Sequence, residues 1–164
     1  MEEECSFTRG RSWFRYRAAA IIVEDGCVLL AGNKSENYLY SVGGGVYVGE
    51  HAEEAVVREV FEETGIRFEV DRLAVIHENF WEGNGAYDKG LHCHEIALYF
   101  LMKPRGTREL DSDSVTRFGD RETMHWVPID QLGEIKAFPT FLKEYFASGH
   151  EGIMHIVTDE RCGG

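Results

Sequence analysis

Proline is scarce in this sequence, with three residues in 164, and the 18 glycines form no long glycine/serine tract. Without a flexible linker, an internal repeat or a low-complexity run, the sequence shows no boundary between domains. Its length fits one domain, and a chain with 43% hydrophobic residues can supply a sizeable core. We therefore expect residues 1–164 to form a single domain.

Long hydrophobic runs are also missing. The longest early apolar run, 18–23, is far too short to cross a bilayer, and the acidic start Met-Glu-Glu-Glu is unlike a secretory signal. The four cysteines, Cys5, Cys27, Cys93 and Cys162, include no C-x-x-C pair. We expect free thiols in a reducing compartment, with a Cys5–Cys162 pair left open, and a cytoplasmic location.

Positive charge is in deficit: 17 lysines and arginines face 29 aspartates and glutamates, a formal net charge of −12. Such a surface repels nucleic-acid backbones and anionic membranes, so we expect neither as a stable partner. An acidic protein that handles phosphates needs a local positive element. A bound divalent cation is the obvious candidate.

The periodicity of the sequence predicts strands alternating with helices. The expected strands and extended segments are 13–23, 27–31, 38–42, 66–78, 92–102, 123–127 and 153–157. The first two should pair as a hairpin, because Asp25-Gly26 is a turn signal. Helical patterns cover 50–64, 130–132 and 138–147, whereas 78–90 and 104–121 are expected to be loops. This order favours an α/β sandwich with a mixed sheet.

The expected helix 50–64 carries an unusual group of acids. Glu59 and Glu63 are one turn apart and Glu62 lies beside them, so three carboxylates project from one face. Packed against a sheet, they would repel one another unless a cation neutralised them. Oxygen ligands of this kind suit Mg²⁺ or Mn²⁺.

The three glycines before this helix fit the same chemistry. Gly43, Gly44 and Gly45 allow a close backbone approach to a ligand, and the helix N-terminus that follows favours anions. Arg58 is no metal ligand, but its fork suits a carboxylate such as Glu50.

The segment 44–66 resembles the box of the Nudix (MutT-like) hydrolase family, G-x5-E-x7-R-E-U-x-E-E-x-G-U, where U is aliphatic. Every defined position is filled, by Gly44, Glu50, Arg58, Glu59, Val60, Glu62, Glu63, Gly65 and Ile66. Val42 stands where many family members have proline. The opening hairpin and Trp126-Val127-Pro128 also resemble the family's layout.

The resemblance implies an α/β/α sandwich with a mixed β-sheet and hydrolysis of a nucleoside diphosphate linked to another group. It implies that Glu59, Glu62, Glu63 and the Gly43 carbonyl hold one to three Mg²⁺ or Mn²⁺ ions. We take Glu59, Arg58 and Glu50 as the catalytic group, with Glu59 favoured as general base. The family's alternative base is a later acid, here Glu109, Asp111, Asp113, Asp120 or Glu122. A homodimer is an option that the family offers.

Substrate contacts are expected partly outside the box. Gly44 and Gly45 are candidates for the phosphates, and Arg15 and Arg17, on one side of a strand, for phosphates or a base. Tyr40 and Trp81, the latter in the expected loop 78–90, are candidates for stacking on a base. Each of these rings and arginines also has a plain structural reading, as sheet edge or packing.

Two neighbouring possibilities can be weighed from the residues. In a strand, His92 and His94 face away from Cys93 and Glu95, which excludes a four-ligand zinc site, although Glu95 alone could reach the metal centre. Cys93 leaves isoprenoid diphosphate isomerisation open. The remaining alternatives are a nucleotide sugar such as ADP-ribose or a dinucleoside polyphosphate as substrate, and a catalytically inactive regulator that binds a ligand.

Overall fold

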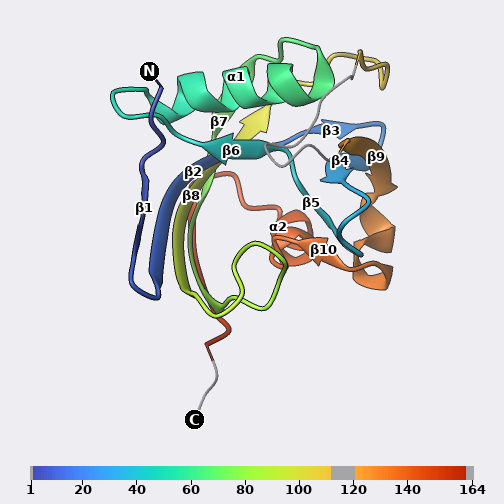
Figure 1. Ribbon diagram of the computed structural model, residues 1–164. Coiled ribbons are helices and arrows are strands. Elements are labelled where there is room, and N and C mark those ends of the chain that lie inside the picture. The colour runs from blue at the N-terminus through green and yellow to red at the C-terminus, as the bar shows by residue number, and fades with distance from the viewer. Residues whose placement is uncertain (1, 112–120, 162–164) are drawn as a thin grey trace.

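The computed structural model describes residues 2–111 and 121–161 (Figure 1). The expected acids Asp113 and Asp120 and the thiol of Cys162 lie outside them. In chain order the elements are β1 (Ser6–Arg9), β2 (Ser12–Ile21), β3 (Val23–Glu24), β4 (Cys27–Gly32), β5 (Leu39–Ser41), β6 (Gly43–Gly45), α1 (Ala52–Thr64), β7 (Val70–Glu82), β8 (His92–Met102), β9 (Thr123–Pro128), the 3-10 helix η1 (Ile129–Glu134), β10 (Ala137–Phe138), α2 (Leu142–Ser148) and β11 (Met154–Asp159).

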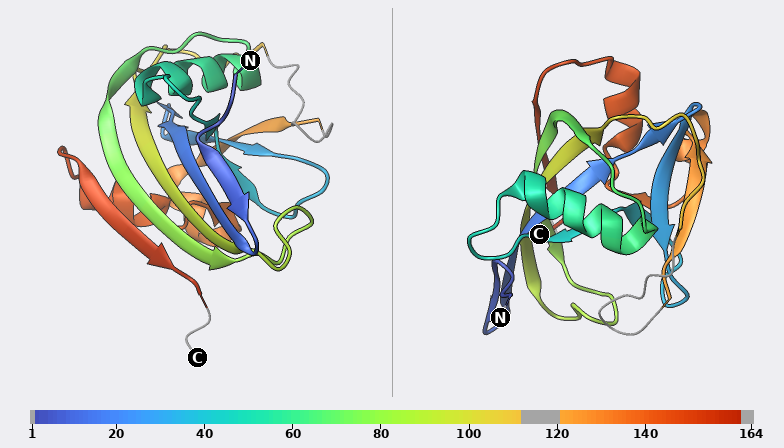
Figure 2. Two further views of the ribbon diagram at one scale, coloured as in Figure 1. Left: turned by 60° about the vertical axis from the view of Figure 1, so that its left-hand side comes forward. Right: turned by 90° about the horizontal axis from the view of Figure 1, so that it is seen from above.

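The strands of the described residues form two sheets. The six-stranded sheet has the order β1-β2-β8-β7-β11, with β6 also beside β2, and Figure 2 shows its long strands side by side as one curved surface. Its β2–β8 and β7–β11 pairs are parallel and the others antiparallel. The five-stranded sheet has the order β10-β5-β4-β3, with β9 beside β4. The predicted mixed α/β architecture is confirmed, but the division into two sheets was not predicted.

The two helices pack on opposite faces of the strands. Alternate residues of β2 belong to different cores: Ala18 and Ala20 pack with α1, whereas Ala19 and Ile21 pack with α2. This alternation follows from the strand geometry, which sends successive side chains to opposite sides. The result is the expected α/β/α arrangement, and we call the two sides of the six-stranded sheet the α1 face and the α2 face.

The expected hairpin at the start of the chain is only partly correct. The predicted strand 13–23 divides into β2, in the six-stranded sheet, and β3, in the five-stranded sheet. Only β3 pairs with β4 around the Asp25-Gly26 turn, where both residues have positive φ. Tertiary pairing decides this division, because β2 runs for ten residues beside β8.

The prediction of a loop over 78–90 is wrong for its first five residues. Strand β7 continues to Glu82 and stays paired with β8 as far as His92. The predicted helix 138–147 is also too long at its start, since Phe138 lies in β10 and α2 begins at Leu142. The N-terminal strand β1, an exposed edge strand, was missed.

Two smaller expectations concern membranes and thiols. Within residues 2–111 and 121–161, no helix has the length and apolar character needed to cross a bilayer. Cys5, Cys27 and Cys93 are free thiols, as expected.

Candidate metal and diphosphate site

The glycine strand β6 and the acidic helix α1 are in direct contact. Strand β6 pairs antiparallel with β2 and leads through a short loop into the helix. A Cβ added to Gly44 would lie 2.5 Å from the carboxylate of Glu59, so a larger residue here would displace the end of this side chain. The backbone N–H of Gly43 donates to Oε1 of Glu63 at 3.2 Å. The expected meeting of glycine backbone and helix carboxylates is therefore present.

Helix α1 owes its placement to signals at both ends. Its first turn is acidic, and Glu54 accepts a hydrogen bond from the backbone N–H of His51 at 3.1 Å. At the other end Gly65 has a φ of 73° and donates to the Phe61 carbonyl at 2.8 Å. These caps fix where the helix begins and ends, and its buried residues Ala55, Val56 and Val60 set which face it packs inward.

Arg58 joins the loop, the strand and the helix. It donates to both oxygens of Glu50, at 2.8 and 3.0 Å, to Glu59 at 2.6 Å and to the Gly45 carbonyl at 3.0 Å. Its guanidinium lies 3.9 Å from the centre of the Tyr47 ring. The expected Arg58–Glu50 contact is confirmed. Such a fork sets the position of Glu59 relative to the backbone of β6.

The carboxylates of Glu59 and Glu63 are destabilised in their charged form. Burial raises the pKa of Glu63 well above its usual value, and the nearby Glu122 and Glu59 raise it further, whereas Arg17 opposes the rise. Burial also raises the pKa of Glu59, against the opposing effect of Arg58. Negative charge here is costly, which is the condition under which a cation would bind.

The donors fit a hard divalent cation in chemical type, since they are carboxylate oxygens beside glycine backbone. They are not assembled as a finished cage: in the part of the chain that the structure describes, no three His, Cys, Asp or Glu side chains are gathered as a metal site. Glu59 instead faces Arg58, and the side chain of Glu62 is 53% exposed. A cation would have to draw these two side chains toward Glu63.

Of the later acids that the structure describes, Glu122 is the one whose charge acts on Glu63. The hydroxyl of Tyr40 donates to Glu122 at 3.2 Å. The backbone N–H of Asp111 donates to the Thr64 carbonyl at 2.9 Å, at the C-terminal end of α1. Tyr40, expected to contact substrate, is thus placed beside the acids.

Arg17 and Arg15 lie on the same face of β2, as expected, but have different partners. Arg17 is buried and donates to the Ser41 carbonyl at 2.8 Å, to the Ser41 hydroxyl at 3.1 Å and to the Tyr99 hydroxyl at 3.3 Å. Burial would lower the pKa of Arg17, but Tyr99 and Glu95, with Glu63 and Glu59 behind them, raise it. Arg17 is therefore coupled to the carboxylate site. Ser41 and Tyr99 were missed, because neither has a motif around it.

Arg15 is engaged by a carboxylate of its own. Its Nε and Nη2 atoms donate to Oε2 of Glu95 at 2.9 and 2.6 Å, and its guanidinium lies 5.3 Å from the Trp13 ring centre. Glu95 was considered as an additional metal ligand. Its carboxylate is instead bound to Arg15 and does not join the carboxylates of α1.

Trp81 is not brought to the carboxylates. Its indole N–H donates to Asp88 at 2.9 Å, and its ring meets Trp13 edge-on at 5.8 Å. It pairs with Cys93, whereas Arg17 pairs with Ala97. Four residues along a strand separate these levels by about 13 Å.

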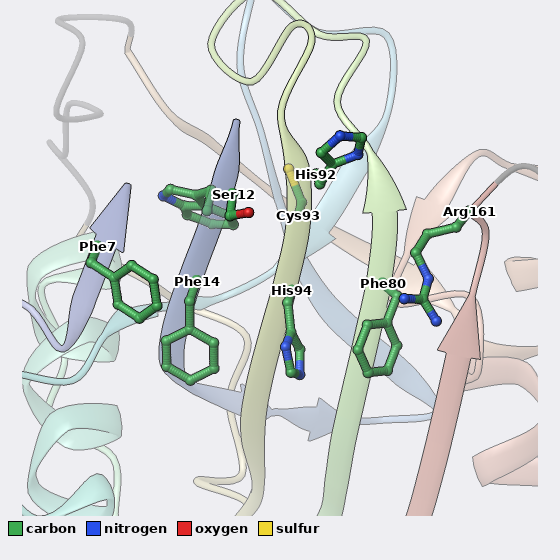
Figure 3. A pocket seen from close by; sticks show the side chains of 9 residues that line it. Phe7, Ser12, Phe14, Phe80, His92, Cys93, His94 and Arg161 are labelled. Carbon is green, nitrogen blue, oxygen red and sulfur yellow. The ribbon is translucent and has the colours of Figure 1, made fainter. Parts of the chain in front are cut away.

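The strand carrying His92 to Glu95 alternates as predicted: Cys93 and Glu95 are buried, and His92 is exposed on the opposite face. A hollow of about 260 Å³ is lined by Phe7, Ser12, Trp13, Phe14, Phe80, His92, Cys93, His94 and Arg161, whose side chains Figure 3 shows. None of the α1 carboxylates lines it. This hollow is separate from the candidate site.

Comparison with known proteins gives the family. The NUDIX domain profile matches residues 13–148. A MutT-like protein of Streptomyces ambofaciens is 35% identical over 118 residues, which cover 71% of this chain and 65% of that protein. The chain belongs to the Nudix hydrolase family. It spans about two thirds of the length of this relative.

Solved structures share the fold. The crystal structure of a MutT NUDIX hydrolase from Burkholderia pseudomallei has a TM-score of 0.61 at 26% identity, covering 80% of this chain and 97% of that chain. The MutT protein from Methanosarcina mazei Go1 has a TM-score of 0.62 at 20% identity, covering 86% and 95%. The second likeness concerns the fold alone.

Proposed function

We propose that this protein hydrolyses a diphosphate bond in a nucleoside di- or triphosphate, or in a related nucleoside diphosphate derivative, with Mg²⁺ or Mn²⁺ as cofactor. The observation that carries the proposal is the contact between α1 and β6: the Glu59 carboxylate lies against Gly44, and Glu63 accepts the Gly43 N–H. Family membership supports the same chemistry.

The chain's own residues divide the work. Glu59, Glu62, Glu63 and the Gly43 carbonyl would hold the cation. When bound, such an ion screens diphosphate charge and lowers the pKa of a bound water. Glu59 accepts the proton of the attacking water, and Arg58 with Glu50 keeps Glu59 in place through the hydrogen bonds described above.

Other residues would bind the substrate. Gly44 and Gly45 let the diphosphate approach the backbone, and Arg17 supplies positive charge next to the carboxylates. Tyr40 and Trp81 are proposed as further substrate contacts, with Trp81 at the nucleoside end because of its distance along the sheet.

A substrate panel tests the proposal. Purified protein would be incubated with Mg²⁺ or Mn²⁺ and canonical or oxidised nucleoside triphosphates, nucleotide sugars including ADP-ribose, and dinucleoside polyphosphates. Products would be identified by chromatography. We expect metal-dependent release of phosphate, pyrophosphate or a nucleoside monophosphate from at least one class. No release from any compound, with nucleotide binding retained, would support a regulator instead.

A further inference from the structure

The α2 face of the six-stranded sheet carries a graded series of polar and aromatic side chains. Strand register sets the levels. Counted away from the carboxylate site they are Arg17–Ala97–His77, then Arg15–Glu95–Asn79, then Trp13–Cys93–Trp81. Residues two apart on a strand share a face, so successive levels lie about 7 Å apart. The series runs from charged and buried to aromatic.

Glu95, at the middle level, uses only one of its two carboxylate oxygens in hydrogen bonds. The residue is 5% exposed, and its Oε2 atom accepts both hydrogen bonds from Arg15. No described residue donates a hydrogen bond to its Oε1 atom. Burial alone would raise the pKa of Glu95, but Arg15 and Arg17 outweigh burial and hold the pKa below its usual value. The Oε1 atom is not among the fully buried unpartnered atoms of the described residues, so it is an ionised acceptor that a ligand can reach.

Two neighbours of Glu95 also have polar atoms that no described residue bonds. Asn79 lies opposite it on β7, and within the described chain no recorded hydrogen bond uses the Asn79 side chain. His77, one level deeper and 2% exposed, has a buried Nδ1 atom without a hydrogen-bond partner. Phe141 covers His77 and Tyr99, with ring centres 4.9 and 5.1 Å away. The buried unpartnered atom on this face is thus that of His77, one level deeper, whereas Glu95 and the part-exposed Asn79 present polar groups that a ligand can reach.

The position of this level matches the shape of a nucleotide. Arg17, one level away, is coupled to Glu59 and Glu63, where the diphosphate is proposed to bind. Trp13 and Trp81, one level further out, offer ring faces of the kind on which bases stack. A nucleoside attached to the diphosphate would therefore reach Glu95 with its base.

We propose that Glu95 is a specificity-determining residue, whose Oε1 atom accepts a hydrogen bond from the amino group of a nucleobase. The inference rests on the proposed nucleotide-binding function of the same site. A carboxylate only accepts hydrogen bonds, so it selects bases with exocyclic amino donors, namely cytosine, adenine and guanine. Uracil and thymine place carbonyl oxygens there and would be disfavoured.

Binding calorimetry with blocked nucleotides tests this without requiring turnover. The probes are the non-hydrolysable α,β-methylene diphosphates of cytidine and uridine, adenosine and inosine, and guanosine and inosine, each with Mg²⁺. We expect the amino-bearing member of at least one pair to bind about tenfold or more tightly. Glu95→Gln should reduce that preference to within about twofold. Glu82→Gln, whose carboxylate pairs with His92, is the matched control and should keep it.

A ligand-side measurement guards against an unfolded variant. The N4,N4-dimethylcytidine analogue has no amino hydrogens, and wild-type protein should bind it as weakly as the uridine analogue. No preference within any pair, no measurable binding, or a preference that Glu95→Gln leaves unchanged would overturn the inference. If Glu95→Gln left the preference unchanged and the protein hydrolysed nucleotides, the inference would be wrong and the proposed function would remain. If the preference depended on Glu95 but no compound was hydrolysed, the inference would remain and the proposed function would be wrong.

Discussion

Strands β2, β8 and β7 present two unlike surfaces at nearly the same level. On the α1 face, Phe14, His94 and Phe80 form a row of ring contacts, with centres 5.3 and 4.3 Å apart. On the α2 face, one residue along, Arg15 and Glu95 form a partly buried ion pair. The aromatic row leaves the buried Nε2 atom of His94 without a hydrogen-bond partner, whereas the charged row leaves Oε1 of Glu95, which is not fully buried, without a donor from the described residues.

The difference between the aromatic row and the ion pair indicates that the two faces have different roles. Ring contacts of this kind contribute about 0.5–1.5 kcal/mol per pair to stability beyond buried area. A buried ion pair pays desolvation and is often no better than apolar residues of similar size. Charges retained on the α2 face and beside β6 therefore point to ligand binding. Variants of the two regions should separate activity from stability.

The largest effect is expected from Glu59→Gln. The amide keeps the size and an acceptor for Arg58 but loses the charge and the basicity, so kcat should fall by about 10³-fold or more. The thermal midpoint should stay within a few degrees. Glu53→Gln, on the exposed first turn of the same helix, is the control and should leave kcat unchanged. Full activity of Glu59→Gln would remove Glu59 from the mechanism.

A pH dependence of stability is expected from the α2 face. Burial lowers the pKa of His77 to about 4, against a usual value of about 6.5. Between these values the unfolded chain takes up a proton that the folded chain refuses. The free energy of unfolding should therefore fall as the pH drops from 6.5 toward 4, by about 1.4 kcal/mol per pH unit.

Urea unfolding of wild type and His77→Gln at pH 7.5, 6 and 5 checks this point. The variant should lose less stability than wild type over the same range, because glutamine does not titrate. Parallel pH profiles for the two proteins would show that the α2 face does not hold His77 neutral.

The sequence predicted the contacts around the α1 helix better than it predicted the contacts on the α2 face. The sequence predicted the contact of Arg58 with Glu50, because short-range rules place these residues, but it did not predict the hydrogen bond from Arg58 to Glu59. It could not show that Arg17 reaches Ser41 and Tyr99, since those contacts depend on which strands pair across the sheet. The loop predicted for 78–82 failed for the same reason: pairing with β8 extends the strand.

Arg58→Lys tests a residue that serves both activity and stability. Lysine cannot contact Glu50, Glu59 and the Gly45 carbonyl at once, so kcat/KM should fall about 10- to 100-fold. The loop before α1 should also loosen, at a cost of about 1–2 kcal/mol in unfolding free energy. Arg67→Lys, an exposed arginine stacked on Phe61, is the control. Lost stability with unchanged kcat/KM would assign Arg58 to the scaffold alone.

The smallest effect, and the sharpest test of the comparison, is expected from Phe80→Ala. Phe80 is half-buried, stacks on His94 and lies 4.5 Å beneath Arg161, so its loss should lower the unfolding free energy by about 1–2 kcal/mol. Phe80→Leu should recover part of this by restoring volume without the stacking. Because neither change touches the α2 face, kcat/KM should stay within about twofold of wild type under conditions where the variants are fully folded. A larger loss of activity from Phe80→Ala would mean that the two faces are coupled, since β7 carries Phe80 on one side and Asn79 and Trp81 on the other.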